Sequence, residues 1–137
     1  MRAIRDIRLK QYDYKGDGYY FVTAVCDRRS NHFKGKEIVV TNELKDLEAK
    51  TNGLKLDYFV VMPNHVHIIF ILHQSDLLLG EIVRRFKAKV AYAFQQKIWQ
   101  PNYYEHVIRT EKALERIREY IINNPQEYIL EFGKFYM

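Results

Sequence analysis

The sequence contains few residues that could cross-link the chain or anchor it in a membrane. Cys26 is the only cysteine in 137 residues, so no internal disulfide can form, which indicates a reducing compartment such as the cytoplasm. The longest strongly apolar run, Ile68 to Leu72, is far shorter than the roughly 20 residues of a membrane helix. The N-terminus lacks the apolar stretch of a secretory signal. Without a repeat, a low-complexity segment or a linker, residues 1–137 are expected to form a single cytoplasmic domain.

Acidic residues are missing from one stretch in which basic residues are concentrated. Residues 84–100 carry five basic side chains and no acidic one, and residues 1–36 carry nine basic and four acidic side chains. Two basic blocks on a small domain favour a polyanionic partner such as nucleic acid, although a solvated surface explains them equally well. The candidate phosphate contacts are Arg84, Arg85, Lys87 and Lys89 in one block and Arg5, Arg8 and Lys10 in the other.

The spacing of apolar residues predicts alternating strands and helices. β-branched and aromatic runs predict strands at residues 19–26, 54–62, 65–72 and 103–109. Helical periodicity and capping residues predict helices from Thr41 to about Lys50, from Leu77 to about Trp99, and from Thr110 to about Asn123. This order, without its last helix, matches the split β-α-β arrangement of ferredoxin-like folds. We therefore expect an α+β fold with a four-stranded antiparallel sheet, helices on one face and an added C-terminal helix, leaving the other face available for a ligand or partner.

His65 and His67 lie two residues apart in the strand that follows the Pro63-Asn64 turn. Alternate residues of a strand point to the same face, so both imidazoles face one way while Val66 faces the core. Their Cβ atoms are then roughly 7 Å apart, which allows them to converge on one metal ion. The alternative is two ordinary histidines of a sheet. A metal site would need a third ligand, such as an amide or a carboxylate.

Tyr120 and Asn124 are four residues apart on the predicted C-terminal helix and therefore share a face. Both flank the apolar stripe that Leu114, Ile117 and Ile121 form. Tyr120 alone could equally be a boundary tyrosine with a buried ring and a hydrated hydroxyl, because the chain contains eleven tyrosines.

Several segments together resemble one family. The stretch from Val60 to His67 (VVMPNHVH) resembles the HUH signature of single-tyrosine transposases, in which a bulky apolar residue separates two histidines. The segments YYEHVIR, from Tyr103, and EYIINNP, from Glu119, resemble the C-terminal block of that family. The opening from Ile7 to Thr23 is also similar. The resemblance covers nearly the whole chain in the right order and is strongest to the REP-associated tyrosine transposases.

The resemblance implies a role for each matching residue. His65 and His67 correspond to the metal ligands, Tyr120 to the nucleophile, and Asn124 to the polar residue that completes the metal site. Related transposases often have glutamine at that last position, and the shorter asparagine has less reach. Glu105 and His106 also match the motif, but it gives them no definite role, and a structural role is equally plausible.

The resemblance further implies an enzyme that nicks and rejoins single-stranded, hairpin-containing DNA. Tyr120 would form a covalent 5′-phosphotyrosine with the help of Mg²⁺ or Mn²⁺. The enzyme would be nucleoid-associated, and either a monomer or a homodimer with shared active sites. Two alternatives stay open: a non-catalytic DNA- or RNA-binding protein on the same fold, and a metal hydrolase that uses water and forms no protein–DNA adduct.

Overall fold

A computed structural model describes residues 16–123 of the chain. The elements in chain order are β1 (Gly18–Val25), the 3-10 helix η2 (Asp27–Arg29), α1 (Glu37–Lys50), β2 (Leu54–Met62), β3 (His65–Leu72), α2 (Leu79–Phe94), β4 (Tyr104–Ile108) and α3 (Glu111–Asn123). The strands form one antiparallel, four-stranded sheet in the order β2-β3-β1-β4. The predicted α+β fold with a ferredoxin-like sheet is therefore confirmed.

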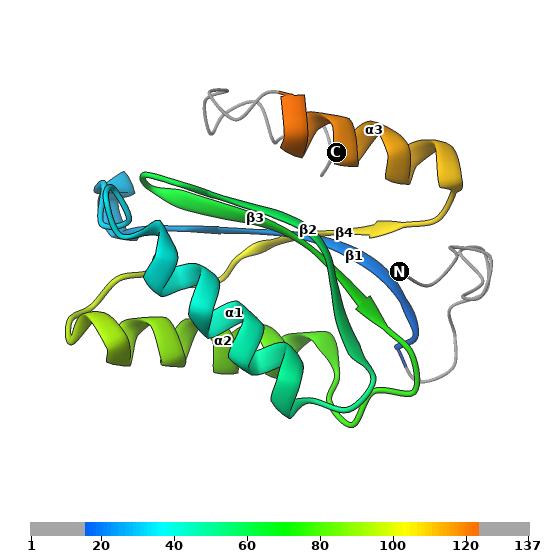
Figure 1. The fold of residues 1–137 in the computed structure, drawn as a ribbon, viewed down its shortest axis with the longest axis horizontal. Helices are drawn as coiled ribbons and strands as arrows, with labels where there is room; N and C mark the ends of the chain where they lie inside the picture. Colours follow the sequence, from blue (N-terminus) through cyan, green and yellow to red (C-terminus); the bar gives the residue numbers. More distant parts are fainter. Residues whose placement is uncertain (1–15, 124–137) are drawn as a thin grey trace.

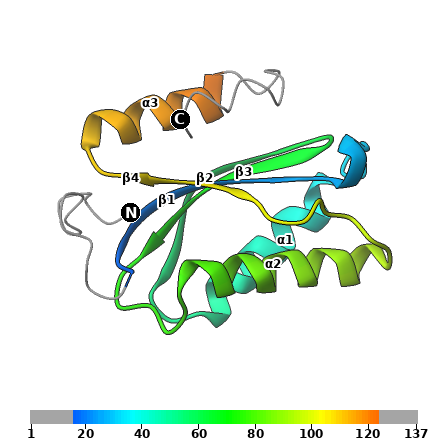
Figure 2. The ribbon, with the colours of Figure 1, turned by 180° about the vertical axis from the view of Figure 1, so that it is seen from behind.

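The first face of the sheet is covered by α1 and α2, which lie side by side in Figures 1 and 2. Val40, Leu44 and Leu47 form the buried stripe of α1, at the spacing that places residues on one side of a helix. The sheet contributes alternate residues of β3 to this layer, Val66, Ile68 and Phe70, which are fully buried. This apolar layer is the main core of the protein.

The second face of the sheet is covered in part by α3 (Figure 1). Leu114, Ile117 and Ile121 of α3 pack against Ile69 and Ile71 of β3 and form a second apolar cluster with other sheet residues. The expectation that this face stays available for a ligand was therefore wrong for the part beneath α3. The amphipathic C-terminal helix buries its apolar stripe on the uncovered side of the sheet.

The helix α1 begins earlier than the sequence predicted. Thr41 was expected as its N-cap, but the helix starts at Glu37, and Lys36 makes no capping hydrogen bond with its side chain. The buried stripe starts at Val40, before Thr41, so core packing fixes the first turn. Packing outweighs the cap preference here, since a single cap contributes only about 1 kcal/mol.

The helix α2 is shorter than predicted at its C-terminal end. It stops at Phe94 instead of continuing to about Trp99, because Gln95 adopts a left-handed conformation with φ 56°. Ile98 and Trp99 continue the apolar pattern from an extended segment, and Trp99 forms a β-bridge with Cys26. No helix within residues 16–123 is long and apolar enough to span a membrane.

Candidate active site

The strand β3 presents its two histidines to the face that carries α3. The register pairs His65 with Met62 across the Pro63-Asn64 turn, so His65 is the first residue of the strand. His65 and His67 are 2% and 3% exposed, and their ring centroids are 4.7 Å apart. The predicted division of β3 into a histidine face and a packing face is therefore confirmed.

Asn64 orients the His65 ring. The Asn64 Oδ1 and His65 Nδ1 atoms are 2.7 Å apart, and the Asn64 amide nitrogen donates to the Arg29 carbonyl at 3.4 Å, which fixes the orientation of the amide. An amide oxygen only accepts hydrogen bonds, so His65 Nδ1 carries the proton and Nε2 keeps a lone pair. His65 Nε2 is buried and has no hydrogen-bond partner within residues 16–123.

Thr23 orients the His67 ring from the neighbouring strand. Thr23 of β1 lies directly opposite His67 of β3, and its hydroxyl oxygen is 2.8 Å from His67 Nδ1. Thr23 is itself fully buried. This contact joins residues 44 positions apart, so it depends on strand register that the sequence pattern does not reveal. The sequence offers one sign of this contact, which is a threonine within a predicted strand of otherwise apolar and aromatic residues.

Burial keeps both imidazoles neutral. It lowers the pKa of His65 to about 4. Burial, and to a smaller extent electrostatic repulsion from His65, lower the pKa of His67 to about 3. Both rings are therefore uncharged at neutral pH, and the neutral imidazole is the form that binds a metal ion.

Tyr120 lies on α3 directly above the histidines. Its ring meets the His67 ring edge-on, with the centroids 5.3 Å apart and the planes inclined at 71°. The side chain is 5% exposed and belongs to the apolar cluster beneath α3. Residues from β3 and α3 that are 53 positions apart in the sequence thus meet at one place.

The two histidines fit a divalent cation as part of its ligand set. Neutral rings held by Asn64 and Thr23, with a buried His65 Nε2 lone pair, are typical of imidazole ligands whose second nitrogen is fixed by a hydrogen bond. Residues 16–123 contain no group of three His, Cys, Asp or Glu side chains that could hold a metal. The predicted third ligand, Asn124, lies outside the described residues, as do Arg5, Arg8 and Lys10.

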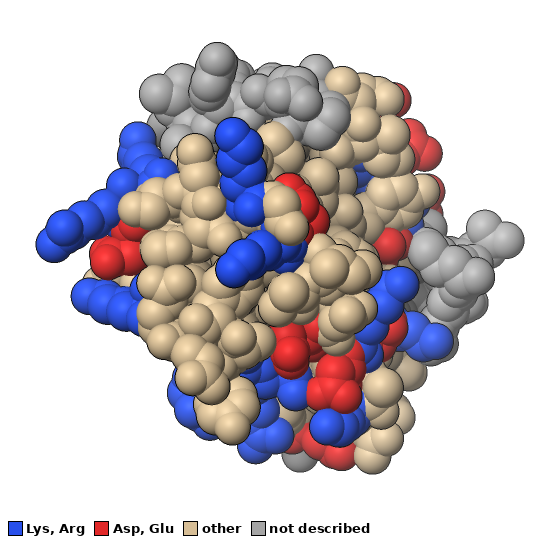
Figure 3. Space-filling model, turned by 60° about the vertical axis from the view of Figure 1, so that its left-hand side comes forward, with Lys and Arg blue, Asp and Glu red and all other residues tan. Residues whose placement is uncertain are grey.

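The predicted DNA-binding residues of α2 lie on the opposite side of the sheet from Tyr120 and the histidines (Figure 1). Arg84 and Arg85 both bind Glu81, and Lys89 binds Asp46 of α1. The basic residues of this acid-free stretch therefore pair with acidic residues from outside it, Glu81 in the preceding turn of α2 and Asp46 in α1. In Figure 3, basic and acidic side chains lie beside one another over the lower part of the molecule.

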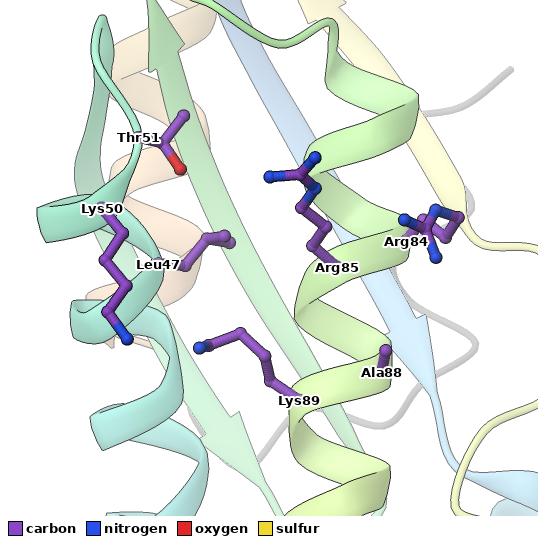
Figure 4. A pocket seen from close by; sticks show the side chains of 7 residues that line it. All are labelled: Leu47, Lys50, Thr51, Arg84, Arg85, Ala88 and Lys89. Carbon is purple, nitrogen blue, oxygen red and sulfur yellow. The ribbon is translucent and has the colours of Figure 1, made fainter.

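A groove of about 280 Å³ lies between α1 and α2. Figure 4 shows Arg85 and Lys89 extending from α2 toward α1, where Lys50 lies. Lys87 is not part of this groove: its ammonium group donates to the carbonyls of Gln100 and Asn102 at 2.9 and 2.8 Å. The four cations predicted together therefore have different surroundings.

Glu105 and His106 of β4 lie on different faces of the sheet. His106 is paired with Phe21, which packs in the cluster beneath α3, so His106 faces the side of the sheet that carries Tyr120. Glu105 faces the other side. The charges of Arg109 and Arg116 add to burial in lowering the pKa of His106.

Comparison with known proteins identifies the family. The profile of the IS200-like transposases matches residues 15–124. An uncharacterised Haemophilus influenzae protein is 36% identical over 158 aligned positions, which cover 88% of this chain and 87% of that protein. The REP-associated tyrosine transposase of Escherichia coli is 27% identical over 120 positions, covering 87% of this chain and 72% of the relative.

A solved structure agrees with these relatives. The structure of a REP-associated tyrosine transposase bound to a REP hairpin superposes with a TM-score of 0.73 at 27% identity, and covers 90% of this chain and 72% of that one. The chain therefore belongs to the IS200-like transposase family. Within that family it is similar to the REP-associated tyrosine transposases, and the predicted resemblance is confirmed.

Proposed function

We propose that this protein nicks and rejoins single-stranded, hairpin-containing DNA, with Tyr120 as the nucleophile. The observation that carries the proposal is the contact between the Tyr120 and His67 rings, 5.3 Å between centroids, beside His65. A tyrosine hydroxyl and two neutral imidazoles held together at one buried place are the parts that such a reaction needs. The relative that is named as bound to a REP hairpin supports DNA of that kind as the substrate.

The proposed reaction is a displacement at phosphorus. The Tyr120 oxygen forms a bond to the phosphorus of a DNA phosphodiester as the bond from phosphorus to the 3′ oxygen breaks. The phenol proton passes to solvent, and the leaving 3′ oxygen takes up a proton. The product is a 5′-phosphotyrosine, a phosphodiester that keeps the energy of the broken bond. A DNA 3′ hydroxyl can attack it and rejoin a strand without ATP.

We propose that His65 and His67 hold Mg²⁺ or Mn²⁺, with Asn124 as a further ligand. A bound divalent cation would neutralise charge on the phosphate and favour the ionised phenol, whose ordinary pKa is about 10. Asn64 and Thr23 would keep the two imidazoles turned toward that cation. Imidazole suits Mn²⁺ better than Mg²⁺, so the affinity for Mn²⁺ should be the higher.

We propose that the cations of α2, and Arg5, Arg8 and Lys10, bind DNA backbone. Arg84, Arg85, Lys87 and Lys89 lie across the sheet from Tyr120 and cannot reach the phosphate that Tyr120 attacks. Their contribution would be to a remote part of the DNA, such as the stem of a hairpin. Contacts of this kind strengthen binding in low salt without specifying sequence.

The proposal is tested by incubating the protein with single-stranded hairpin oligonucleotides taken from DNA flanking its own gene. With Mn²⁺, a denaturing gel should show labelled DNA that migrates with the protein, and EDTA should abolish that band. Tyr120→Phe should bind the hairpin and form no such band. Binding without any nicking would favour the non-catalytic alternative, and nicking without a protein-linked band would favour hydrolysis by water.

A further inference from the structure

The strand β2 contains a bulge beneath α3. Leu56 pairs with Phe70 and Phe59 pairs with Ile68, so two residues, Asp57 and Tyr58, face the single residue Ile69. Leu56 and Phe59 both pack in the core under α1 and α2. The extra residue therefore turns two successive side chains, Asp57 and Tyr58, toward α3, where a regular strand would turn one.

Arg118 of α3 binds both of these side chains. Its Nε donates to Asp57 Oδ2 at 2.7 Å and its Nη2 donates to Asp57 Oδ1 at 2.6 Å, which is a two-point contact of fixed geometry. Its guanidinium carbon lies 5.1 Å from the centre of the Tyr58 ring. The Asp57 side chain is 0% exposed and that of Arg118 is 21% exposed. A carboxylate buried this completely needs its cation.

The contact between Arg118 and Asp57 prevents a rotation of α3 about its own axis that apolar packing alone would allow. Leu114, Ile117 and Ile121 hold the helix on the sheet, but apolar contact has no direction and tolerates a small rotation about the helix axis. Arg118 and Tyr120 are two residues apart and project about 200° apart around that axis. They therefore occupy the two flanks of the helix, and a rotation that moves Arg118 also moves Tyr120 across the His67 ring.

We propose that Asp57 and Arg118 are positioning residues that set the rotation of α3 and thereby hold Tyr120 against His67. The effect on catalysis rests on the proposed function, whereas the effect on the position of Tyr120 does not. The bulge is needed for this positioning, because it places both Asp57 and Tyr58 beneath Arg118.

The catalytic consequence is tested with Arg118→Met and, as matched control, Lys112→Met, which removes an exposed charge from the first turn of the same helix. At saturating hairpin, the single-turnover rate of adduct formation should fall about 10- to 100-fold in Arg118→Met, as misplaced reacting groups require. Hairpin affinity should be unchanged, and Lys112→Met should match the wild type. Arg118→Lys, which keeps the charge but loses the two-point contact, should recover part of the rate. Equal rates in Arg118→Met and Lys112→Met would overturn the proposal.

The structural consequence is measured without any reaction. The edge-on Tyr120 ring should displace the NMR signals of the His67 ring protons, and Tyr120→Ala identifies that displacement. Arg118→Met should reduce this displacement of the His67 signals, and Lys112→Met should leave it unchanged. Asp57→Asn, which keeps the shape of the side chain, should behave like Arg118→Met and carries the test if Arg118→Met does not fold. An undisturbed His67 signal in a folded Asp57→Asn protein would refute the positioning role, even if wild-type protein forms no adduct.

Discussion

Asn64 is the single residue that most directly determines how His65 can act. It accepts the hydrogen bond from His65 Nδ1 and leaves the lone pair on Nε2, the atom that we propose binds the metal ion. We predict that Asn64→Ala lowers the affinity for Mn²⁺ about tenfold or more, as loss of a partner behind a histidine ligand does. Calorimetric titration with Mn²⁺ in the presence of hairpin DNA, in Tyr120→Phe protein, measures this.

The control for this experiment is Asn52→Ala. Asn52 is exposed and donates to Asp76, away from the histidines. The Asn52→Ala variant should have the same affinity for Mn²⁺ as the protein without this substitution. Equal affinities in the two variants would mean that Asn64 does not orient the ligand.

The buried histidines should also make stability depend on pH. Their pKa values of about 4 and about 3 in the folded protein lie below the ordinary value of about 6.5 expected after unfolding. Above about pH 6.5 the two histidines are neutral in the folded and in the unfolded protein. As the pH falls below about 6.5, the unfolded chain binds protons that the folded protein does not, so the free energy of unfolding decreases.

The expected decrease is up to about 2 kcal/mol per histidine between pH 7 and pH 5. Urea unfolding at the two pH values, with EDTA present, measures it. The double variant His65→Gln/His67→Gln should show a smaller difference, since the other histidines are the same in both proteins. An identical difference in both proteins would show that these two rings do not titrate as described.

At the scale of elements, the segment after α2 is held by Lys87. Its ammonium group donates to two carbonyl oxygens, and Trp99 Nε1 donates back to the Lys87 carbonyl at 2.9 Å. We predict that Lys87→Met lowers the free energy of unfolding by about 1 to 2 kcal/mol, because both carbonyls lose a charged donor. Arg85→Met, which removes an exposed guanidinium bound to Glu81, should change it little.

Urea denaturation of the two variants compares these effects, and a filter-binding assay with hairpin DNA at low salt separates them from DNA binding. If Lys87→Met is as stable as the wild type, the two carbonyl contacts do not hold the segment after α2. A loss of DNA affinity in this variant, measured under conditions in which it stays folded, would support the proposed contact of Lys87 with DNA backbone.

The sequence predicted some elements well for a clear physical reason. The limits of β2 and β3 agree with the prediction, because two apolar runs separated only by Pro63-Asn64 leave no other hairpin. The limits of α3 also agree, because the predicted cap Thr110 accepts a hydrogen bond from the Ala113 amide at 3.1 Å. The start of α1 and the end of α2 agree less well, since they follow core packing at Val40 and a left-handed turn at Gln95 that no capping rule indicates.

The same distinction applies to the site. The residues with chemistry of their own, His65, His67 and Tyr120, could be named from the sequence. The residues that orient them could not, because Thr23 reaches His67 across 44 positions and Arg118 reaches Asp57 across 61. Those contacts depend on strand register and on a bulge, which a single sequence does not encode in any local pattern.

At the scale of the whole molecule, one chain is sufficient to bring Tyr120 and His67 together. The contact between their rings lies within a single chain. We therefore predict that a homodimer, if it forms, does not share active sites. A mixture of Tyr120→Phe and His65→Ala/His67→Ala proteins should form no adduct. Recovery of adduct on mixing would show that Tyr120 acts on the histidines of a second subunit.

The burial of the site has a consequence for the whole molecule as well. Tyr120, His65 and His67 are each 5% exposed or less, so a DNA phosphate reaches them only when atoms that now cover them move. Substrate binding and exposure of the site should therefore be coupled, which would shield the proposed nucleophile Tyr120 from other phosphate esters in solution.

The proposed function requires that one tyrosine out of eleven, Tyr120, becomes linked to DNA. The most direct measurement is mass spectrometry of the protein–oligonucleotide adduct after nuclease and protease digestion, with the modified peptide sequenced. We predict a nucleotide attached through its 5′ phosphate to Tyr120. A nucleotide on any other tyrosine, or attachment through a 3′ phosphate, would contradict it.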